Sequence, residues 1–486
     1  MRVSNQPVTL LENNNVQLIP RWQDIRNWIA VFFLIRLIGI TNAPLETGHN
    51  WRQSLTAMIA RNFVEHRANL LYPEIDYDGA GSGIIGSEFP FFNYLIYLFS
   101  LLFDYSHWYG RLINLIVSSI GIYFFYKLIE KLSNSKIAFN ASIVLLSSIW
   151  FAFSRKIMPD TFSISLVIIG LYYGYSYLFS GAWIKLVAFF LLTTLGVLCK
   201  IPALSLLAVV GVLFFVKEIP QNRKLAVWGS AVLGFGIVSL WYFYWVPYLV
   251  ETYHNQLFFP RGLLEGLKEI IPMADGFFRN FYFNAFHSYV AFAAFLAGIY
   301  FVITGKNNYI KAGVMIITCF FFTFILKTGN VFPLHNYYII PFVPVMAFIA
   351  GIALDKLKVK WLAFVLFVVV AEGIANQQHD FFVILDKLSY KKALETITDK
   401  KIGPDELIVI NGGQSPQEIY FAHRKGWSVT NDQITPTSLA LYKQAGASFL
   451  IINNRTFPDF GNYLPLVYVG RDYRVFNLKE YIPTVQ

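Results

Sequence analysis

The stretches 46-ETGHNWRQSLTAMIARNF-63 and 74-EIDYDGAGSGIIGSEFP-90 form a polar region between the first apolar segment and a strongly apolar remainder of the chain. Ionisable side chains are costly in a bilayer unless they serve a site, a path or a partner. We therefore expect a membrane-helix fold interrupted by one large polar loop. We also expect the chemistry of the protein to lie in that loop.

The composition indicates a polytopic membrane protein. Of the 486 residues, 56% are hydrophobic and 14% are charged, whereas a soluble domain carries about 25% charged residues. Cys199 and Cys319 both lie in apolar segments, which excludes a disulfide framework and a cysteine-based metal site. The net charge of +10 does not indicate nucleic-acid binding. Many Lys and Arg residues lie in short loops between apolar segments, where they act as topology signals.

Apolar segments long enough to cross a bilayer recur along most of the chain. About 20 apolar residues span a membrane, and shorter spans occur in bundles. We predict a mainly α-helical transmembrane bundle of about eleven spans. The predicted spans are 25–41, 108–126, 137–154, 161–179, 184–199, 201–216, 225–248, 286–304, 310–326, 336–353 and 361–377.

Four short loops indicate the orientation of these spans. With a cytoplasmic N-terminus, the basic loops 127–136, 217–224, 305–311 and 355–360 all fall inside, as the positive-inside rule requires. The large loop 42–107 is then extracytoplasmic. We expect an integral protein of a bacterial inner or plasma membrane with its active site on the outer face.

The sequence changes character after the last apolar segment. The runs 407–411 and 449–452 are short, apolar and followed by turn residues, which predicts buried strands, and helical patterns occupy the residues between them. We therefore predict two domains. Residues 1–378 form the transmembrane domain, with outer loop 42–107 carrying surface helices, and residues 379–486 form a small extracytoplasmic α/β domain.

The first half of the polar region has helical spacing. Apolar residues recur from Trp51 to Phe63, which predicts an amphipathic helix at the membrane surface. His49 precedes this helix, where free backbone N–H groups and the positive dipole end favour an anion. We expect a phosphate near His49 and Arg52. The alternative is an ordinary interfacial helix with an Arg52 side chain that reaches the headgroups.

Five short motifs follow one another in a familiar order. They are His49-Asn50-Trp51-Arg52-Gln53, Glu88-Phe89-Pro90, Met158-Pro159-Asp160, LCKIP (198–202) and LHNYYIIPFVP (334–344). Over about residues 20–380 this order resembles the membrane glycosyltransferases of the GT-C type that use polyprenyl-phosphate sugars. That superfamily includes the protein O-mannosyltransferases and the lipid A aminoarabinose transferases.

The resemblance implies an enzyme that transfers a sugar, with inversion, from a polyprenyl-phosphate donor to an extracytoplasmic glycan, lipid or protein. It implies binding of the donor phosphate and sugar by residues on the outer face, and catalysis by nearby acids or bases. The residues expected to bind the donor are Arg52, Gln53, Glu88, Arg155, Lys200, His335 and Tyr337. The residues expected in catalysis are His49, Glu46 and Asp160.

One motif departs from the family pattern. The family has an acidic pair at the position of His49 and Asn50, and a neutral hydroxyl acceptor needs a base to remove its proton. His49, Glu46, Asp76 and Asp78 are candidates for this base, and an anionic acceptor would need none. Asp160 has an alternative as well, since after Pro159 it could serve only as the N-cap of a helix.

A divalent metal is a further expectation from the outer face. Glu88 and His254 could share one, although two scattered ligands fall short of a metal signature. Two other function classes stay open. One is a lipid or glycolipid transporter or flippase, which would need mid-span charges; Arg36 and Glu372 are the clearest of these, and both lie close to span ends. The other is a non-catalytic subunit of a polysaccharide assembly machine.

Overall fold

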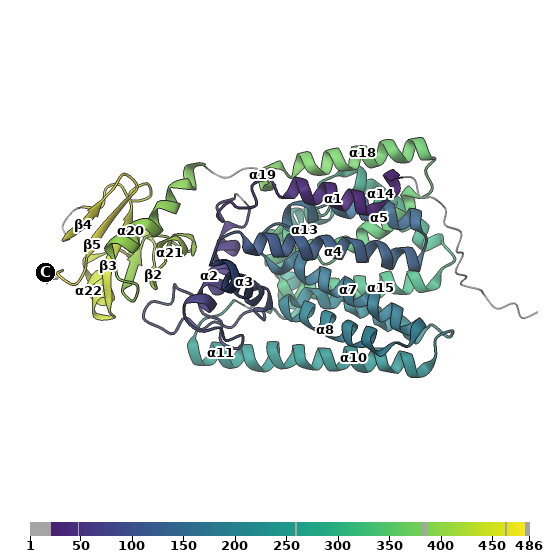
Figure 1. The fold of residues 1–486 in the computed structure, drawn as a ribbon, viewed down its shortest axis with the longest axis horizontal. Helices are drawn as coiled ribbons and strands as arrows, with labels where there is room; N and C mark the ends of the chain where they lie inside the picture. The colour runs from purple at the N-terminus through teal and green to yellow at the C-terminus, as the bar shows by residue number, and fades with distance from the viewer. Residues whose placement is uncertain (1–20, 47, 258–259, 382–385, 462–463, 482–486) are drawn as a thin grey trace, which may run out of the picture.

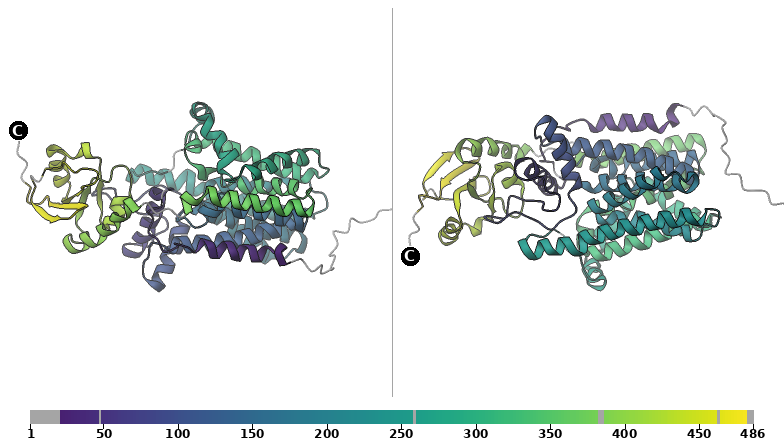
Figure 2. Two further views of the ribbon diagram at one scale, coloured as in Figure 1. Left: turned by 90° about the horizontal axis from the view of Figure 1, so that it is seen from above. Right: turned by 60° about the horizontal axis from the view of Figure 1, so that its bottom comes forward.

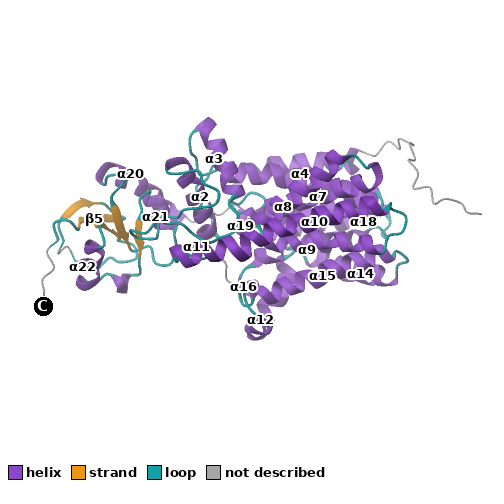
Figure 3. Cartoon of the chain, turned by 90° about the horizontal axis from the view of Figure 1, so that it is seen from below, coloured by secondary structure: helices purple, strands orange, loops and turns teal. Residues whose placement is uncertain are grey.

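A computed structural model describes residues 21–46, 48–257, 260–381, 386–461 and 464–481. It consists of a long helical bundle with a small α/β part at one end (Figure 1). In the part of the chain that the structure describes, the strands lie at that end only (Figure 3). This architecture confirms a polytopic helical bundle followed by a small sheet. The outer ends of the predicted domains, in 1–20 and 482–486, lie outside the described residues.

Ten helices make up most of the bundle. Local sequence explains several of their ends. The Asn134, Ser288 and Asn307 side chains accept hydrogen bonds from first-turn N–H groups, as N-caps do. The helices are α1 (Ile25–Arg36), α4 (Tyr109–Leu132), α5 (Ser135–Ser147), α7 (Pro159–Ser180), α8 (Trp183–Cys199), α10 (Gln221–Leu240), α14 (Tyr289–Thr304), α15 (Asn308–Thr328), α17 (Val343–Leu354) and α18 (Val359–Asn376).

Shorter segments connect or extend these helices. A π-helical turn, Trp241–Trp245, joins α10 to α11 without a break in the axis, and a 3-10 segment, Ala208–Phe214, follows α9. The short helices are α6 (Trp150–Phe153), α9 (Leu204–Leu207), α11 (Val246–Tyr253), α12 (Leu263–Ile270), α13 (Ala274–Arg279), α16 (Val331–Leu334) and α19 (Gln378–Phe381).

Only some of the described helices are long and apolar enough to span a membrane. In the described residues, five helices are long and apolar enough to cross a bilayer, or up to six if a pair bent by 94° counts as one span. Every predicted span coincides with a helical segment, but several segments are only 10–17 residues long. The chain is an integral membrane protein by these helices, and the count of eleven spans stays a prediction.

The predicted inner loops meet at one end of the bundle. The Lys136 ammonium lies 3.2 Å from the Asp355 carboxylate, and the Tyr309 hydroxyl donates to Glu218 at 3.2 Å. The α/β part occupies the other end in every view (Figures 1 and 2). The chain therefore sorts its basic loops and its polar loop to opposite ends.

The polar loop holds two helices, α2 (Asn50–Glu65) and α3 (Phe91–Phe103). The prediction of a helix at Trp51–Phe63 is confirmed, but its predicted position at the membrane surface is wrong. All residues from Gln53 to Phe63 are buried, because α2 packs against α3 on one side and α21 (Gln417–Ala422) on another. The apolar α3 was not predicted as a separate helix.

The α/β part contains one five-stranded sheet of order β2-β1-β3-β5-β4. The first three strands are parallel, with Val409 opposite Trp427 and Leu450, and β5 and β4 add antiparallel. The predicted strands at 407–411 and 449–452 are confirmed as β1 and β3. The elements are α20 (Ala393–Lys401), β1 (Leu407–Ile410), α21, β2 (Gly426–Ser428), α22 (Pro436–Gln444), β3 (Ala447–Asn453), β4 (Leu466–Val469) and β5 (Tyr473–Asn477).

Candidate active site

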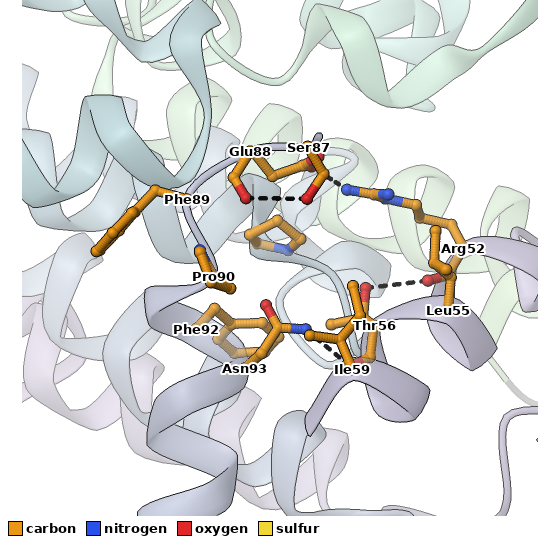
Figure 4. Close-up of a pocket in the computed structure, with 11 residues that line it drawn as sticks. Arg52, Leu55, Thr56, Ile59, Ser87, Glu88, Phe89, Pro90, Phe92 and Asn93 are labelled. Carbon is orange, nitrogen blue, oxygen red and sulfur yellow. Dashed lines mark hydrogen bonds and ion pairs between the residues drawn. The ribbon is translucent and has the colours of Figure 1, made fainter. Parts of the chain in front are cut away.

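A small pocket lies between α2, the loop before α3 and the first turn of α7. Figure 4 shows the Arg52 and Glu88 side chains facing each other across it. Its cavity volume is about 10 Å³, which is room for about one water molecule. The lining residues are Arg52, Leu55, Thr56, Ile59, Ser87, Glu88, Phe89, Pro90, Phe92, Asn93 and Pro159.

Two cations and two carboxylates meet beside this pocket, and we call Arg52, Glu88, Asp160 and Lys200 the four-charge cluster. Arg52 forms an ion pair with Glu88. The Lys200 Nζ lies 3.3 Å from Glu88 Oε1 and 3.5 Å from Asp160 Oδ1. The four side chains are 5 to 18% exposed, so they interact in a partly desolvated setting where electrostatic forces are strong.

Asp160 does not act as a helix cap. Met158 is the N-cap residue of α7 and Pro159 occupies the first turn, so Asp160 lies within the helix. The capping alternative is wrong, and one oxygen of this carboxylate, Oδ2, is buried and has no hydrogen-bond partner among the described residues.

Lys200 lies at the turn between α8 and the 3-10 helix Ile201–Ala203. Its ammonium stands 5.5 Å from the Tyr337 ring centroid and 5.8 Å from that of Tyr338, within the range of cation–π contacts. The predicted motifs LCKIP and LHNYYIIPFVP thus meet at the site. The ring of His335, another predicted donor-binding residue, stacks on Tyr337 at 5.5 Å. Burial, with the Lys200 charge, lowers the pKa of His335.

His49 contacts Tyr337 edge to face, with a ring-centroid distance of 4.8 Å. Its Nε2 is 2.9 Å from Asn336 Oδ1, an arrangement that favours a proton on Nε2 and a free lone pair on Nδ1. Its backbone has the left-handed conformation, φ 58°, which is uncommon outside glycine. Burial, assisted by the Lys156 charge, lowers the pKa of His49 to about 4.

Glu46, just before α2, and Gln53, within α2, lie away from the pocket lining. Glu46 forms an ion pair with Arg111 of α4, and Gln53 Nε2 donates to Glu46 Oε2 at 3.1 Å. The backbone N–H of Ile157 donates to Gln53 Oε1 at 3.1 Å. Because Glu46 is 5% exposed and Gln53 fully buried, these contacts fix α2 to α4 and the 154–158 turn. In this geometry neither residue faces the pocket.

Arg155 and Lys156 lie in the turn before α7. Arg155 donates to the Phe381 carbonyl at 3.0 Å and stands 4.3 Å over the Phe381 ring. Lys156 donates to the Gly48 carbonyl at 3.0 Å and lies 3.7 Å from Asp380. Asp380 was missed by sequence reasoning, because nothing in its sequence context connects it to a loop more than 300 residues away.

Glu88 and His254, the predicted metal-binding pair, do not contact each other through any hydrogen bond or ion pair in the described residues, and His254 is exposed at the end of α11. Asp76, another candidate base, is buried and receives hydrogen bonds from Arg61 at 3.0 Å and Asn62 at 2.8 Å. A metal shared by Glu88 and His254 stays a prediction.

Known proteins share both sequence and fold with this chain. Residues 87–245 match the model of the dolichyl-phosphate-mannose-protein mannosyltransferase family. No curated protein matches the chain by sequence. ArnT from Cupriavidus metallidurans has a similar solved structure in the apo state, with 13% identity, a TM-score of 0.63, and coverage of 93% of this chain and 98% of ArnT.

The similarity extends to two further solved structures. ArnT bound to undecaprenyl phosphate matches with 13% identity, a TM-score of 0.61, and coverage of 95% and 99%. The archaeal oligosaccharyltransferase AglB from Archaeoglobus fulgidus, in complex with an inhibitory peptide and a dolichol-phosphate, matches with 12% identity and a TM-score of 0.56. That match covers 89% of this chain and 69% of AglB.

The resemblance to the GT-C glycosyltransferases is confirmed. At these identities the solved structures establish the fold. Within the GT-C fold of this chain, the family match begins at Ser87, one residue before Glu88, and includes Asp160 and Lys200. Three members of the four-charge cluster therefore lie inside the matched region, and Arg52 lies before it.

The ionisable residues inside apolar segments have structural partners. Glu372 of α18 accepts from the Ser288 hydroxyl at 2.6 Å and from the Tyr289 backbone N–H at 3.1 Å, at the start of α14. Arg36 donates to the Phe32 carbonyl at 3.0 Å and to Ser154. These contacts join α18 to the start of α14 and the end of α1 to Ser154.

Proposed function

We propose that this protein transfers a sugar from a polyprenyl-phosphate donor to an extracytoplasmic acceptor, with inversion at the anomeric carbon. The observation that carries the proposal is the four-charge cluster on a GT-C fold, at the end of the bundle that bears the polar loop. The bound lipids named for the similar structures, undecaprenyl phosphate in ArnT and dolichol-phosphate in AglB, support a polyprenyl-phosphate donor.

The two cations of the cluster suit the leaving group. As the glycosidic bond breaks, negative charge grows on the lipid phosphate, and preorganised cations in a partly dry site lower the energy of that state. Arg52 offers a planar guanidinium that can hold two phosphate oxygens, and Lys200 offers a point charge. Both stand within one side-chain length of the pocket.

The two carboxylates suit the sugar. Glu88 and Asp160 both contact Lys200, and their remaining oxygens can accept hydrogen bonds from sugar hydroxyls. The buried Oδ2 of Asp160, which has no hydrogen-bond partner among the described residues, supports this role, because an unpaired buried acceptor gains a hydrogen bond when the sugar binds.

We assign proton removal to His49. It is neutral at physiological pH, with a pKa of about 4 because it is buried, and the Asn336 contact leaves Nδ1 as the acceptor. Glu46 is less suited, since its carboxylate is committed to Arg111 and Gln53. An acceptor hydroxyl would lose its proton to His49 while its oxygen attacks from the side opposite the phosphate, which gives inversion.

Donor entry requires a rearrangement of the cluster. A cavity of about 10 Å³ holds about one water molecule and is too small for a sugar phosphate. The Arg52–Glu88 ion pair closes the pocket. We infer that the phosphate replaces Glu88 as the partner of Arg52, so that Glu88 is released toward the sugar.

The test uses the full chain in nanodiscs of bacterial lipid. A panel of undecaprenyl-phosphate sugars is added with membranes of the source bacterium as acceptor, and release of undecaprenyl phosphate is measured. Wild type releases the lipid from at least one donor, and Glu88→Gln and Lys200→Ala lose this activity. Lys268→Ala is the matched control, because Lys268 is exposed on α12. Equal release by wild type and Glu88→Gln from every donor would overturn the proposal.

A further inference from the structure

A second group of metal-ligating side chains lies where the α/β part meets the polar loop. Glu395, Asp399 and His423 each offer one ligand atom, and these atoms lie within 4.8 Å of one another. Glu395 and Asp399 are four residues apart on α20, so both project from one face of the helix. His423 follows α21, the helix that packs against α2.

The distances between these atoms fit a single ion. His423 Nδ1 lies 3.4 Å from Glu395 Oε1. Zinc binds nitrogen and oxygen at about 2.0–2.2 Å, so two ligand atoms on one tetrahedral ion stand about 3.3–3.5 Å apart. Without an ion, His423 lies between the Glu65 and Glu395 carboxylates, which raise its pKa to about 9, so a metal ion would take the place of the proton on Nδ1.

A second histidine lies near Glu395, outside the group of three whose ligand atoms all lie within 4.8 Å of one another. His107, in the turn between α3 and α4, has its Nε2 4.0 Å from Glu395 Oε2. Two imidazoles and two carboxylates form a donor set that zinc accepts. Magnesium and calcium instead prefer oxygen ligands alone.

Both histidines are oriented as metal ligands are. The second ring nitrogen of a ligating histidine usually bonds to a carboxylate or another acceptor, which fixes the ring. Here His423 Nε2 lies 2.7 Å from Glu65 Oε1, and His107 Nδ1 lies 2.6 Å from the Tyr420 hydroxyl. Arg424 donates to Asp399 Oδ1 at 2.9 Å and so holds that carboxylate in place.

We propose that Glu395, Asp399, His423 and His107 form a zinc site that clamps the α/β part to the polar loop. The ion would join α20 and the end of α21 to the turn after α3, and its outer partner Glu65 belongs to α2. Because α2 also carries Arg52, the site would hold the pocket wall against the α/β part. It is separate from the predicted Glu88–His254 pair.

The test measures metal binding by the full chain after removal of metals with EDTA. Zn²⁺ is titrated by calorimetry, and Co²⁺ by its visible absorption, whose intensity distinguishes four-coordinate from six-coordinate ions. We expect one saturable site per chain, a four-coordinate Co²⁺ spectrum, and no competition from Mg²⁺. His423→Ala and Glu395→Gln should weaken Zn²⁺ binding by more than about 100-fold, and Glu65→Gln by about 10-fold, as for loss of an outer partner.

Two control variants make the outcome decisive. His66→Ala removes the histidine at the end of α2, whose side chain pairs with Glu74 at 3.5 Å, and should leave binding unchanged. Glu88→Gln should also leave it unchanged; loss of the ion in this variant would place the metal at the predicted pair and overturn the proposal. Absence of saturable Zn²⁺ binding, or equal binding by wild type and Glu395→Gln, would overturn it too. If His423→Ala does not fold, Asp399→Asn takes its place.

Discussion

Two groups of ion-paired side chains include residues of the same polar loop but differ in their exposure to solvent. The four-charge cluster borders the pocket, with side chains 5 to 18% exposed. The Glu46–Arg111 pair is sealed beneath α2, with side chains 0 to 6% exposed. Glu46 and Arg52 are only six residues apart, but Glu46 lies before α2 and pairs with Arg111 of α4, whereas Arg52 lies in the first turn of α2 and pairs with Glu88. The comparison teaches that charged residues close together in the sequence can have different roles, one at the pocket and one in the buried structure.

The largest expected effect is on stability, at the sealed pair. Arg111→Leu leaves Glu46 charged and buried without a partner, which costs about 3–5 kcal/mol. Thermal unfolding of the protein in detergent measures this loss. The double variant Glu46→Met with Arg111→Leu should recover most of it, because an apolar pair of similar volume replaces a buried ion pair at little cost. A single variant as stable as wild type would contradict the structural role.

The control for this experiment is the exposed pair of Arg26 and Asp24. The Arg26 side chain is 74% exposed, so Arg26→Leu should leave the melting temperature nearly unchanged. A loss equal to that of Arg111→Leu would show that burial does not distinguish the two pairs.

The second effect is on activity, at the open cluster. Arg52→Ala should lower the rate of polyprenyl-phosphate release by about 10²–10³-fold, the usual cost of removing one group that stabilises charge in the transition state. Its melting temperature should stay close to that of wild type, because Glu88 keeps Lys200 as a partner. Arg279→Ala, an exposed arginine at the end of α13, is the matched control and should keep full activity.

The third effect concerns pH and His49. With its pKa lowered to about 4 by burial and by Lys156, His49 can accept a proton at all pH values above about 4 and loses this ability below. The acidic limb of kcat should therefore lie near pH 4, and His49→Gln should lower kcat by about 10²-fold, within the range for a general base. Lys156→Met should move the limb upward. A wild-type limb near 6.5, the ordinary value, would contradict a buried base.

The smallest effect is expected at Asp160. Asp160→Asn should raise the KM for the donor by about tenfold, the lower end for a charge-assisted hydrogen bond, with little change in kcat. Its stability should fall by only about 0.3–1 kcal/mol, the usual contribution of a first-turn carboxylate to a helix. Asp275→Asn, in the first turn of α13 and exposed, tests the helix effect alone. A drop in kcat without a change in KM would contradict sugar binding.

Sequence reasoning succeeded where a residue's role depends on local pattern or on motif order. The motifs that contain Arg52, Glu88, Asp160 and Lys200 were placed in one site, and the structure brings these four side chains together. The strands β1 and β3 followed from short apolar runs. The antiparallel strands β4 and β5 were missed, although their sequences LVYV and YRVFN are rich in strand-forming residues.

Sequence reasoning failed where burial comes from distant segments. The helical spacing of Trp51–Phe63 correctly predicted α2, but its polar residues Arg61 and Asn62 are buried because Asp76 and the end of α21 cover them. In the same way, Glu46 was a candidate base until Arg111 of α4 occupied its carboxylate. No pattern within the loop indicates either partner.

The sequence alone determined the membrane class, the order of the helices, the sorting of basic loops and the resemblance to the GT-C glycosyltransferases. These properties follow from hydrophobicity, charge and motif order, which are summed along the chain. Only the tertiary structure decided which charges face the pocket, which are sealed, and how the α/β part covers α2. Those outcomes depend on contacts between residues up to several hundred positions apart, and a side chain's burial and ionic partner are fixed only when those contacts form.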